Sequence, residues 1–162
     1  HEQRATGVGF VRAVALPRPQ SRGSVTLASR DPLVAPNIDL NFLAEPEDRL
    51  RLLEGIRLAR KIGATAPLNA FIRSELNPGA GNESDEALLA SVRASLDTYH
   101  HPTSTAPMGK PGDTGAVVDL QARVIGLQGL RVVDASIFPD VPSVSTNITV
   151  IAVAEKIAAL YA

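Results

Sequence analysis

Two of the three histidines in this 162-residue chain stand side by side, at His100 and His101. Prolines and hydroxyl residues follow them at once, in the stretch "HHPTSTAPMG". An imidazole titrates near neutral pH, so it can take up or release a proton under physiological conditions. Catalytic groups collect in irregular segments that a rigid scaffold holds in place. The pair is therefore a candidate for acid–base chemistry.

Other kinds of site find less support in the sequence. The chain has no cysteine, which excludes disulfides, thiolate metal ligands and a cysteine nucleophile. No cluster of carboxylates is spaced around the histidine pair, so we expect no metal site. The hydroxyls of Ser143, Ser145 and Thr146 lack a surrounding GxSxG motif, and capping or turn roles are the better interpretation.

The composition is that of a globular protein with a hydrophobic core. Sixteen basic residues balance 17 acidic ones, and aromatic residues make up only 4%. Without a basic face or a stacking platform, we expect no nucleic-acid partner. No run of about 18 apolar residues is present and the N-terminus does not resemble a signal peptide. These patterns predict no membrane span and a cytoplasmic location.

The spacing of apolar residues predicts helices on both sides of the histidine pair. The first covers residues 46–63, with Pro46 in its first turn and Gly63 as its cap. A short second helix is expected within 67–76. Ser84 should cap a third helix, whose inward-facing residues are Leu88, Leu89, Val92, Leu96 and Tyr99. This third helix would deliver the chain directly to the histidines.

Strands and a last helix complete the expected scaffold. β-Branched and alternating residues predict strands at 24–29 and around 116–125 and 129–136. The stretch "ITVIAVAEKIAALYA", residues 148–162, should form a helix capped by Thr146 or Asn147. Apolar residues occupy so much of its circumference that we expect burial on more than one side.

Several ordered motifs together resemble one known family. They are "SRGSVTLASRDPLVAPNIDLNFLAEPEDRLRLLEGIRLARKI", "HHPTSTAPMG", "AVVDLQARVIGLQGLRVVDASIFPDVP" and "NITVIAVAEKIA". Their order and spacing are similar to the C-terminal part of the glucose-methanol-choline (GMC) family of FAD-dependent oxidoreductases. The resemblance begins near residue 16 and covers nearly all of the remaining chain.

The resemblance implies roles for individual residues. In the family pattern a histidine stands four residues before a threonine, here Thr105, which selects His101 over His100 as the catalytic base. Asp134 and Ala135 would lie near FAD. The resemblance also implies that the N-terminus of the last helix, around Asn147 and Ile148, points at the flavin ring. A helix N-terminus there would stabilise negative charge on the reduced flavin.

One position departs from the family pattern. A second histidine or asparagine usually stands eleven residues beyond the aspartate of "VVDAS", and this chain has Ser145 there. A serine hydroxyl can donate a hydrogen bond to a substrate oxygen but cannot become a cation or a strong base. Asn147 is the alternative for this second catalytic role.

The resemblance also implies a fold and a division of the chain. The fold class would be α+β: a substrate-binding-domain sheet with flanking helices, followed by a C-terminal strand–helix segment that completes an FAD-binding domain. Residues from about 16 to 115 would form the substrate side, and about 116–162 would return to the FAD domain. The glycine-rich GxGxxG turn that binds FAD phosphates does not occur here, so we expect a missing or separate N-terminal FAD-binding domain.

The leading hypothesis is the substrate-side part of an alcohol oxidase or dehydrogenase. His101 would take the hydroxyl proton of a small-molecule alcohol while hydride passes to FAD. An FAD-containing lyase of the same family is one alternative. The other is a non-catalytic lobe or interaction module without a flavin of its own.

Overall fold

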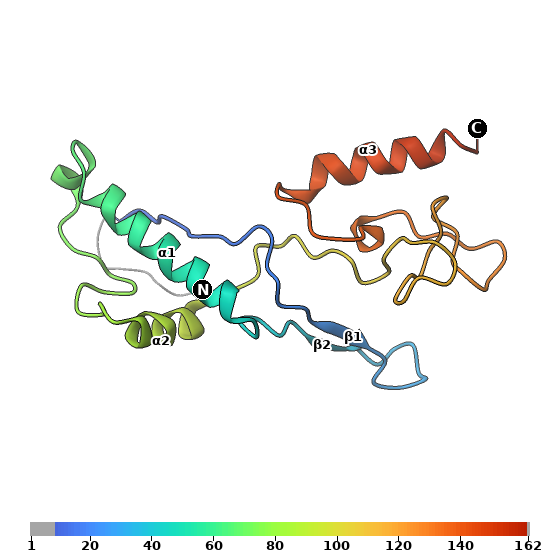
Figure 1. Cartoon of the computed structure of the whole chain (residues 1–162), viewed down its shortest axis with the longest axis horizontal. Helices are drawn as coiled ribbons and strands as arrows, with labels where there is room; N and C mark the ends of the chain where they lie inside the picture. The colour runs from blue at the N-terminus through green and yellow to red at the C-terminus, as the bar shows by residue number, and fades with distance from the viewer. Residues whose placement is uncertain (1–8, 162) are drawn as a thin grey trace. The chain divides into compact units, whose positions relative to one another are not determined.

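The computed structural model describes residues 9–161, which fall into two compact units (Figure 1). Unit 1 contains the described residues up to Leu16 together with Leu43–Tyr99, and unit 2 contains Pro17–Phe42 and the described residues from His100 onward. Within residues 9–161, the regular structure consists of three α-helices, two short strands and two 3₁₀ turns. The sequence "GVGF" at 7–10 has only the first two glycines of the GxGxxG pattern, and its residues 7 and 8 lie outside the described residues. Ala162, the end of the predicted last helix, also lies outside them.

Unit 1 is built on helix α1 (Pro46–Gly63) packed against α2 (Asp85–Ser95). The predicted bounds of α1 are confirmed. The shared core contains Leu43, Leu52 and Val92, with partly buried Val14, Leu16 and Ile56 around them. Gly63 is not the cap that the sequence predicts, because it is the last helical residue. A Cβ atom there would lie 2.3 Å from the Arg12 guanidinium, so glycine permits this close approach.

Helix α2 confirms the predicted start but not the predicted end. The Ser84 hydroxyl accepts a hydrogen bond from the Ala87 N–H at 3.2 Å, as an N-cap does. The helix stops at Ser95 because Leu96 turns to an extended conformation, so Leu96 and Tyr99 do not face inward on it. In place of the short helix within 67–76 there is a single 3₁₀ turn, η1 (Leu68–Phe71).

Unit 2 opens with an antiparallel pair, β1 (Ser24–Thr26) and β2 (Asn37–Asp39). The predicted strand at 24–29 is therefore confirmed only in its first half. Gly23 precedes β1, and a Cβ atom there would lie 2.1 Å from the Asp39 carbonyl oxygen. Only glycine lets the two segments of the hairpin meet this closely at its base.

Isolated bridges replace the two strands predicted around 116–125 and 129–136. Val118 pairs singly with Met108 and Val124, and Arg123 pairs with Arg131. The chain turns too often for longer pairing, because left-handed residues recur at Ala122, Gly126 and Gly129. The core of unit 2 lies beneath these turns and contains Val118, Ala122, Ile137, Phe138 and Ile157.

Helix α3 (Thr146–Ala158) begins two residues earlier than predicted. Ser145 is its N-cap, so Thr146 and Asn147 belong to the first turn and do not cap it. Ile157 is buried in the core, whereas Ile148 is 81% and Ile151 55% exposed. Within residues 9–161 the helix packs on one face, and the predicted burial on more than one side is not observed. None of the described helices has the length and apolar composition that crossing a membrane requires.

Candidate active site

His101 lies in an irregular segment and is fixed to the start of α3. Its Nδ1 atom is 3.2 Å from the hydroxyl oxygen of Thr146, a residue 45 positions further along the chain. Thr146 is buried, with 9% of its surface exposed, and His101 is half-buried. The contact with Thr146 fixes the Nδ1 edge of the imidazole.

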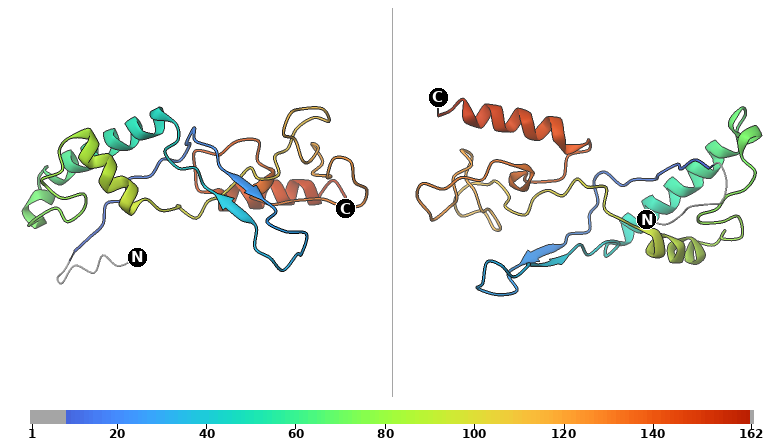
Figure 2. Two further views of the ribbon diagram at one scale, coloured as in Figure 1. Left: turned by 90° about the horizontal axis from the view of Figure 1, so that it is seen from below. Right: turned by 180° about the vertical axis from the view of Figure 1, so that it is seen from behind.

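The segment after His101 is anchored by main-chain hydrogen bonds to the turn η2 (Ala135–Ile137). The N–H groups of Ser104, Ala106 and Met108 donate to the carbonyl oxygens of residues 135, 136 and 137, at 3.2, 2.9 and 2.8 Å. Because Ile137 is only 1% exposed, these bonds fasten the segment to the core of unit 2. Figure 2 shows this part of the chain and α3, in yellow to red, from two sides.

The backbone separates the two adjacent histidines. His100 has a φ of 60° and Ser104 a φ of 67°, so left-handed residues stand on both sides of His101. Non-glycine residues rarely adopt this conformation, and it costs roughly 1–2 kcal/mol at each position. His100 is exposed. The turn at His100 is therefore part of what directs His101 toward Thr146.

The first turn of α3 carries the remaining predicted residues of this end of the site. Ser145 has a φ of −54° and a ψ of 135°, and its side chain makes no capping hydrogen bond. The turn contains no acidic residue. Ser145, Asn147 and Ile148 are all exposed. The positive end of this helix is thus not neutralised by side chains of its own first turn.

Asp134 and Ala135 have local structural roles in the described chain. The Asp134 carboxylate accepts a hydrogen bond from the Ser136 N–H at 2.8 Å and so caps η2. The Ala135 carbonyl accepts from Ser104, as described above. Both residues therefore help to shape the turn against which the His101 segment is held.

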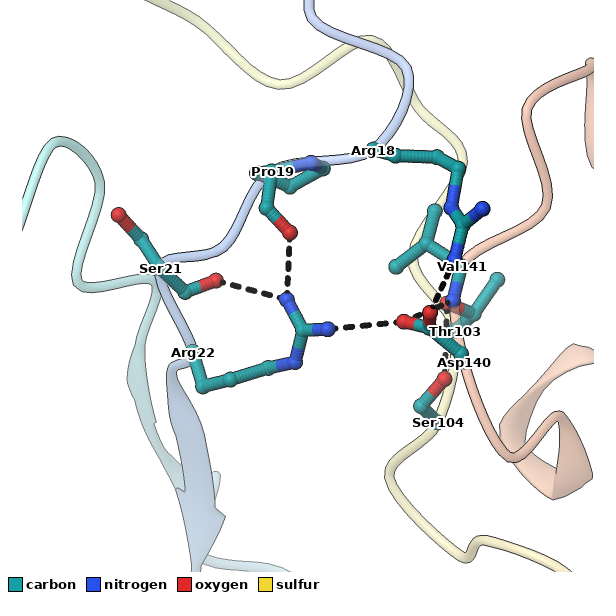
Figure 3. Close-up of polar contacts among 8 residues, drawn as sticks. All are labelled: Arg18, Pro19, Ser21, Arg22, Thr103, Ser104, Asp140 and Val141. Carbon is teal, nitrogen blue, oxygen red and sulfur yellow. Dashed lines mark hydrogen bonds and ion pairs between the residues drawn. The ribbon is translucent and has the colours of Figure 1, made fainter. Parts of the chain in front are cut away.

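A charged cluster that the sequence did not point to lies around Asp140 (Figure 3). Arg18 and Arg22 both donate to its carboxylate, at 2.6 and 2.8 Å, and the Val141 N–H donates at 2.8 Å. These hydrogen bonds, the one from Arg18 foremost, lower the pKa of Asp140 below its ordinary value. In the view of Figure 3, Thr103 and Ser104 of the His101 segment lie at the Asp140 end of this cluster.

A second candidate is an open pocket of about 380 Å³ in unit 1, in which Arg60 and Glu75 are paired with each other. Arg60 binds both carboxylate oxygens of Glu75, at 3.0 and 2.9 Å, and the carbonyl oxygens of Gly79 and Asn82. The hydrogen bond to Glu75 raises the pKa of Arg60. With its donors committed, Arg60 fastens the 75–83 loop to α1 and is not arranged for chemistry. Residues 9–161 contain no group of three or more His, Asp or Glu side chains that could hold a metal ion.

Comparison with known proteins decides the family. The sequence model of the GMC oxidoreductase family matches residues 19–154. The chain belongs to the GMC oxidoreductase family. The resemblance derived from the sequence motifs is thereby confirmed.

Relatives of this GMC chain are close in sequence but much longer. The oxygen-dependent choline dehydrogenases of Paraburkholderia xenovorans (strain LB400) and Chromohalobacter salexigens are 45% and 43% identical over 150 residues. That match covers 93% of this chain and 26% of each relative. The chain therefore spans about a quarter of the length of the curated relatives it matches.

Solved structures agree with this GMC assignment. An FAD-dependent oxidoreductase from Chaetomium thermophilum superposes with a TM-score of 0.82 at 36% identity, over 89% of this chain and 25% of that one. Pyridoxine 4-oxidase from Mesorbium loti also gives a TM-score of 0.82 at 36% identity, over 90% of this chain and 28% of that one. Both neighbours carry oxidoreductase names, and the first is FAD-dependent.

Sequence reasoning missed Thr146 and Asp140 as site residues. Thr146 has the signal of a helix start, which says nothing of a histidine 45 positions away. Asp140 does carry a signal, because it is the only charged residue between Asp134 and Glu155. The basic stretch "RPQSR" at 18–22 is its complement, but only the fold brings the two segments together.

Proposed function

We propose that this chain is the substrate-side part of an FAD-dependent oxidoreductase that oxidises the CH–OH group of a small-molecule alcohol, with His101 as the base. Membership of the GMC family supports the reaction class. The names of its relatives, choline dehydrogenase and pyridoxine 4-oxidase, refer to small alcohols. We keep a cytoplasmic location and the absence of a nucleic-acid partner as predictions from composition.

One observation carries the proposal: His101 and the first turn of α3 meet through the contact with Thr146. In the family pattern that turn faces the flavin, so a base fixed to it would stand beside the reacting carbon. Proton transfer needs a positioned group within hydrogen-bond reach of the hydroxyl. The contact with Thr146 provides such positioning for the imidazole.

The same contact determines which nitrogen acts as base in this proposal. For Nε2 to accept the hydroxyl proton, Nδ1 must carry the hydrogen of the neutral ring. Nδ1–H then donates to the Thr146 hydroxyl oxygen over 3.2 Å. This bond is kept when the ring becomes cationic, because both nitrogens are then donors. Thr146 would thus hold the productive tautomer.

The residues at the start of α3 fit the flavin of FAD. Ser145 makes no side-chain cap and the first turn has no acidic residue, so the helix offers its positive end to a group that gains negative charge. Asn147 and Ile148 would hold the ring, with Asp134 and Ala135 nearby. When bound, FAD would accept hydride from the carbinol carbon.

The second polar role remains with Ser145 or Asn147 in this proposal. Both residues are neighbours of Thr146 in sequence and both are exposed. Each side chain can donate a hydrogen bond to a substrate oxygen. The division of the chain at about residue 115, and the completion of an FAD-binding domain by 116–162, belong to the same proposal. The glycine-rich turn that holds the FAD phosphates would come from a separate part of the flavoprotein.

The test compares the adjacent histidines in the complete flavoprotein. We expect His101→Ala to slow flavin reduction by alcohol by roughly 10²- to 10⁴-fold, the usual effect of losing a positioned base. His100→Ala should change the rate far less and is the matched control. Anaerobic stopped-flow absorbance measures both. Equal reduction rates in wild type and His101→Ala, each fully loaded with FAD, would refute the assignment.

A further inference from the structure

Ser145 ends a stretch of seven residues, 139–145, that connects two buried residues. Phe138, 7% exposed, ends the core turn before it, and Thr146, 9% exposed, begins α3 after it. Within the stretch, residues 139, 140 and 143–145 are exposed. Little apolar burial therefore fixes its path, although it carries Ser145 and leads to the partner of His101.

Asp140, the second residue of this stretch, binds it to another part of unit 2. Its carboxylate receives Arg18 on one oxygen and Arg22 on the other. Charge-assisted hydrogen bonds with guanidinium groups are directional as well as strong. Two arginines on two oxygens therefore fix the orientation of the carboxylate, and the Val141 N–H bond to Oδ1 passes that orientation to the backbone.

The arginine side of the contact is itself held in place. The Arg22 guanidinium also donates to the carbonyl oxygens of Pro19 at 2.6 Å and Ser21 at 3.3 Å (Figure 3). The Arg22 carbonyl accepts from the Asn41 side chain at 2.9 Å, beyond the end of β2. Arg22 thus belongs to the base of the β1–β2 hairpin, and Asp140 connects the 139–145 stretch to that hairpin through Arg22.

We infer that Asp140, held between Arg18 and Arg22, is a positioning residue for the reaction: it fixes the 139–145 stretch so that Ser145 and the Thr146–His101 contact keep their productive geometry. This inference rests on the proposed function of His101. It assigns Asp140 no contact with substrate or FAD. A displacement of about 1 Å at a reacting group can cost as much as 10²-fold in rate, so a residue at this distance in sequence can have a measurable effect.

The test uses Asp140→Asn in the complete flavoprotein, with Asp85→Asn as the matched control. Asp85 forms an exposed ion pair with Arg57 in unit 1, with side chains 60% and 48% exposed, against 44% for Asp140 and 57% for each of its arginines. We expect Asp140→Asn to lower the limiting rate of flavin reduction about tenfold with less than a twofold change in substrate Kd. The control should change neither beyond twofold. Asp140→Glu, which keeps the charge, should recover part of the rate.

Two further readouts separate positioning from a general structural role. Amide hydrogen exchange, measured without substrate, should quicken over 139–147 in Asp140→Asn and not in Asp85→Asn. In a His101→Ala background the Asp140→Asn substitution should have no further effect on rate, because coupled residues are not additive. Should Asp140→Asn fail to fold, Arg22→Lys keeps a positive charge without the guanidinium fork and should give the same pattern more weakly.

The outcomes distinguish this inference from the proposed function. A wild-type rate in His101→Ala would refute the proposed function. The role of Asp140 alone would be refuted by a different result: His101→Ala is slow, but Asp140→Asn matches Asp85→Asn in both flavin-reduction rate and hydrogen exchange. An equal fall in rate in the presence and absence of His101 would also overturn it.

Discussion

Helices α2 and α3 begin in different ways. At α2, the Ser84 hydroxyl caps the Ala87 N–H, and Asp85 and Glu86 place negative charge on the first turn. At α3, the N-cap Ser145 makes no side-chain cap and the first turn contains no acidic residue. The hydroxyl of the first helical residue, Thr146, instead contacts a histidine from a distant segment.

The first turn of α2 is thus capped by a side chain next to it in sequence, whereas the first turn of α3 contacts a residue that is distant in sequence. The four N–H groups of a helix's first turn have no partner inside the helix and need one from elsewhere. At α2 the Ser84 side chain supplies one such partner, to the Ala87 N–H. At α3 the first turn is arranged around His101, and its positive end fits the flavin that we propose.

Breaking the Thr146 contact should have the largest effect. Thr146→Val keeps the shape but removes the oxygen that would accept Nδ1–H in the tautomer that we propose, so His101 would lose its contact with α3. Leaving one buried hydrogen-bonding group unpaired costs about 1–3 kcal/mol. We therefore expect flavin reduction in the complete protein to slow roughly tenfold to hundredfold.

Thr146→Ser is the control for this substitution, because it retains the hydroxyl. It should stay within a few-fold of wild type in the same stopped-flow measurement. If Thr146→Val reduced flavin as fast as Thr146→Ser, the contact would have no part in the reaction and α3 would begin like any other helix.

A pair of serine substitutions sharpens the comparison at the level of stability. Ser84→Ala should lower the free energy of unfolding by about 1 kcal/mol, because it removes an N-cap hydrogen bond. Ser145→Ala should change the free energy of unfolding by only a few tenths of the Ser84→Ala effect, since the Ser145 side chain makes no N-cap hydrogen bond. Urea unfolding of the two variants measures the difference. Equal losses would mean that both serines cap their helices.

The Ser145→Ala variant also addresses the second polar role. Its rate of flavin reduction tells whether this hydroxyl contributes to the reaction. A small change in rate would leave the role vacant or give it to Asn147.

Giving α3 the charge that α2 has should produce the smallest effect. Asn147→Asp places a carboxylate in the first turn, where the helix dipole favours it by about 0.3–1 kcal/mol. The same charge should oppose reduction of a flavin bound at this turn, and 1 kcal/mol corresponds to about 20 mV for a two-electron couple. We expect a slightly lower midpoint potential in redox titration. An unchanged or higher potential would argue against a flavin at the start of α3.

Parts of the fold that depend on neighbouring residues were predictable from the sequence. The proline, the acidic first turn and the basic last turn of α1 predict its bounds, and Ser84 predicts the start of α2. Features of this kind act over one or two helical turns. The strands predicted around 116–125 and 129–136 were wrong, because strand pairing needs partners from elsewhere in the chain. Three left-handed residues interrupt this region, and only single bridges form around Val118 and Arg123.

The sequence by itself determined the family and the helices whose ends are set by local side chains, and the family pattern predicts His101 over His100 as the base. Only the tertiary structure decided that Thr146 meets Nδ1 of His101 and that Arg18 and Arg22 meet on Asp140. The Thr146–His101 contact joins residues that are 45 positions apart in sequence, and the contacts of Asp140 with Arg22 and Arg18 span 118 and 122 positions. No periodicity or capping rule extends over such separations, because local propensities act between near neighbours in sequence. Core packing around Ile137 and Phe138 brings the distant segments together.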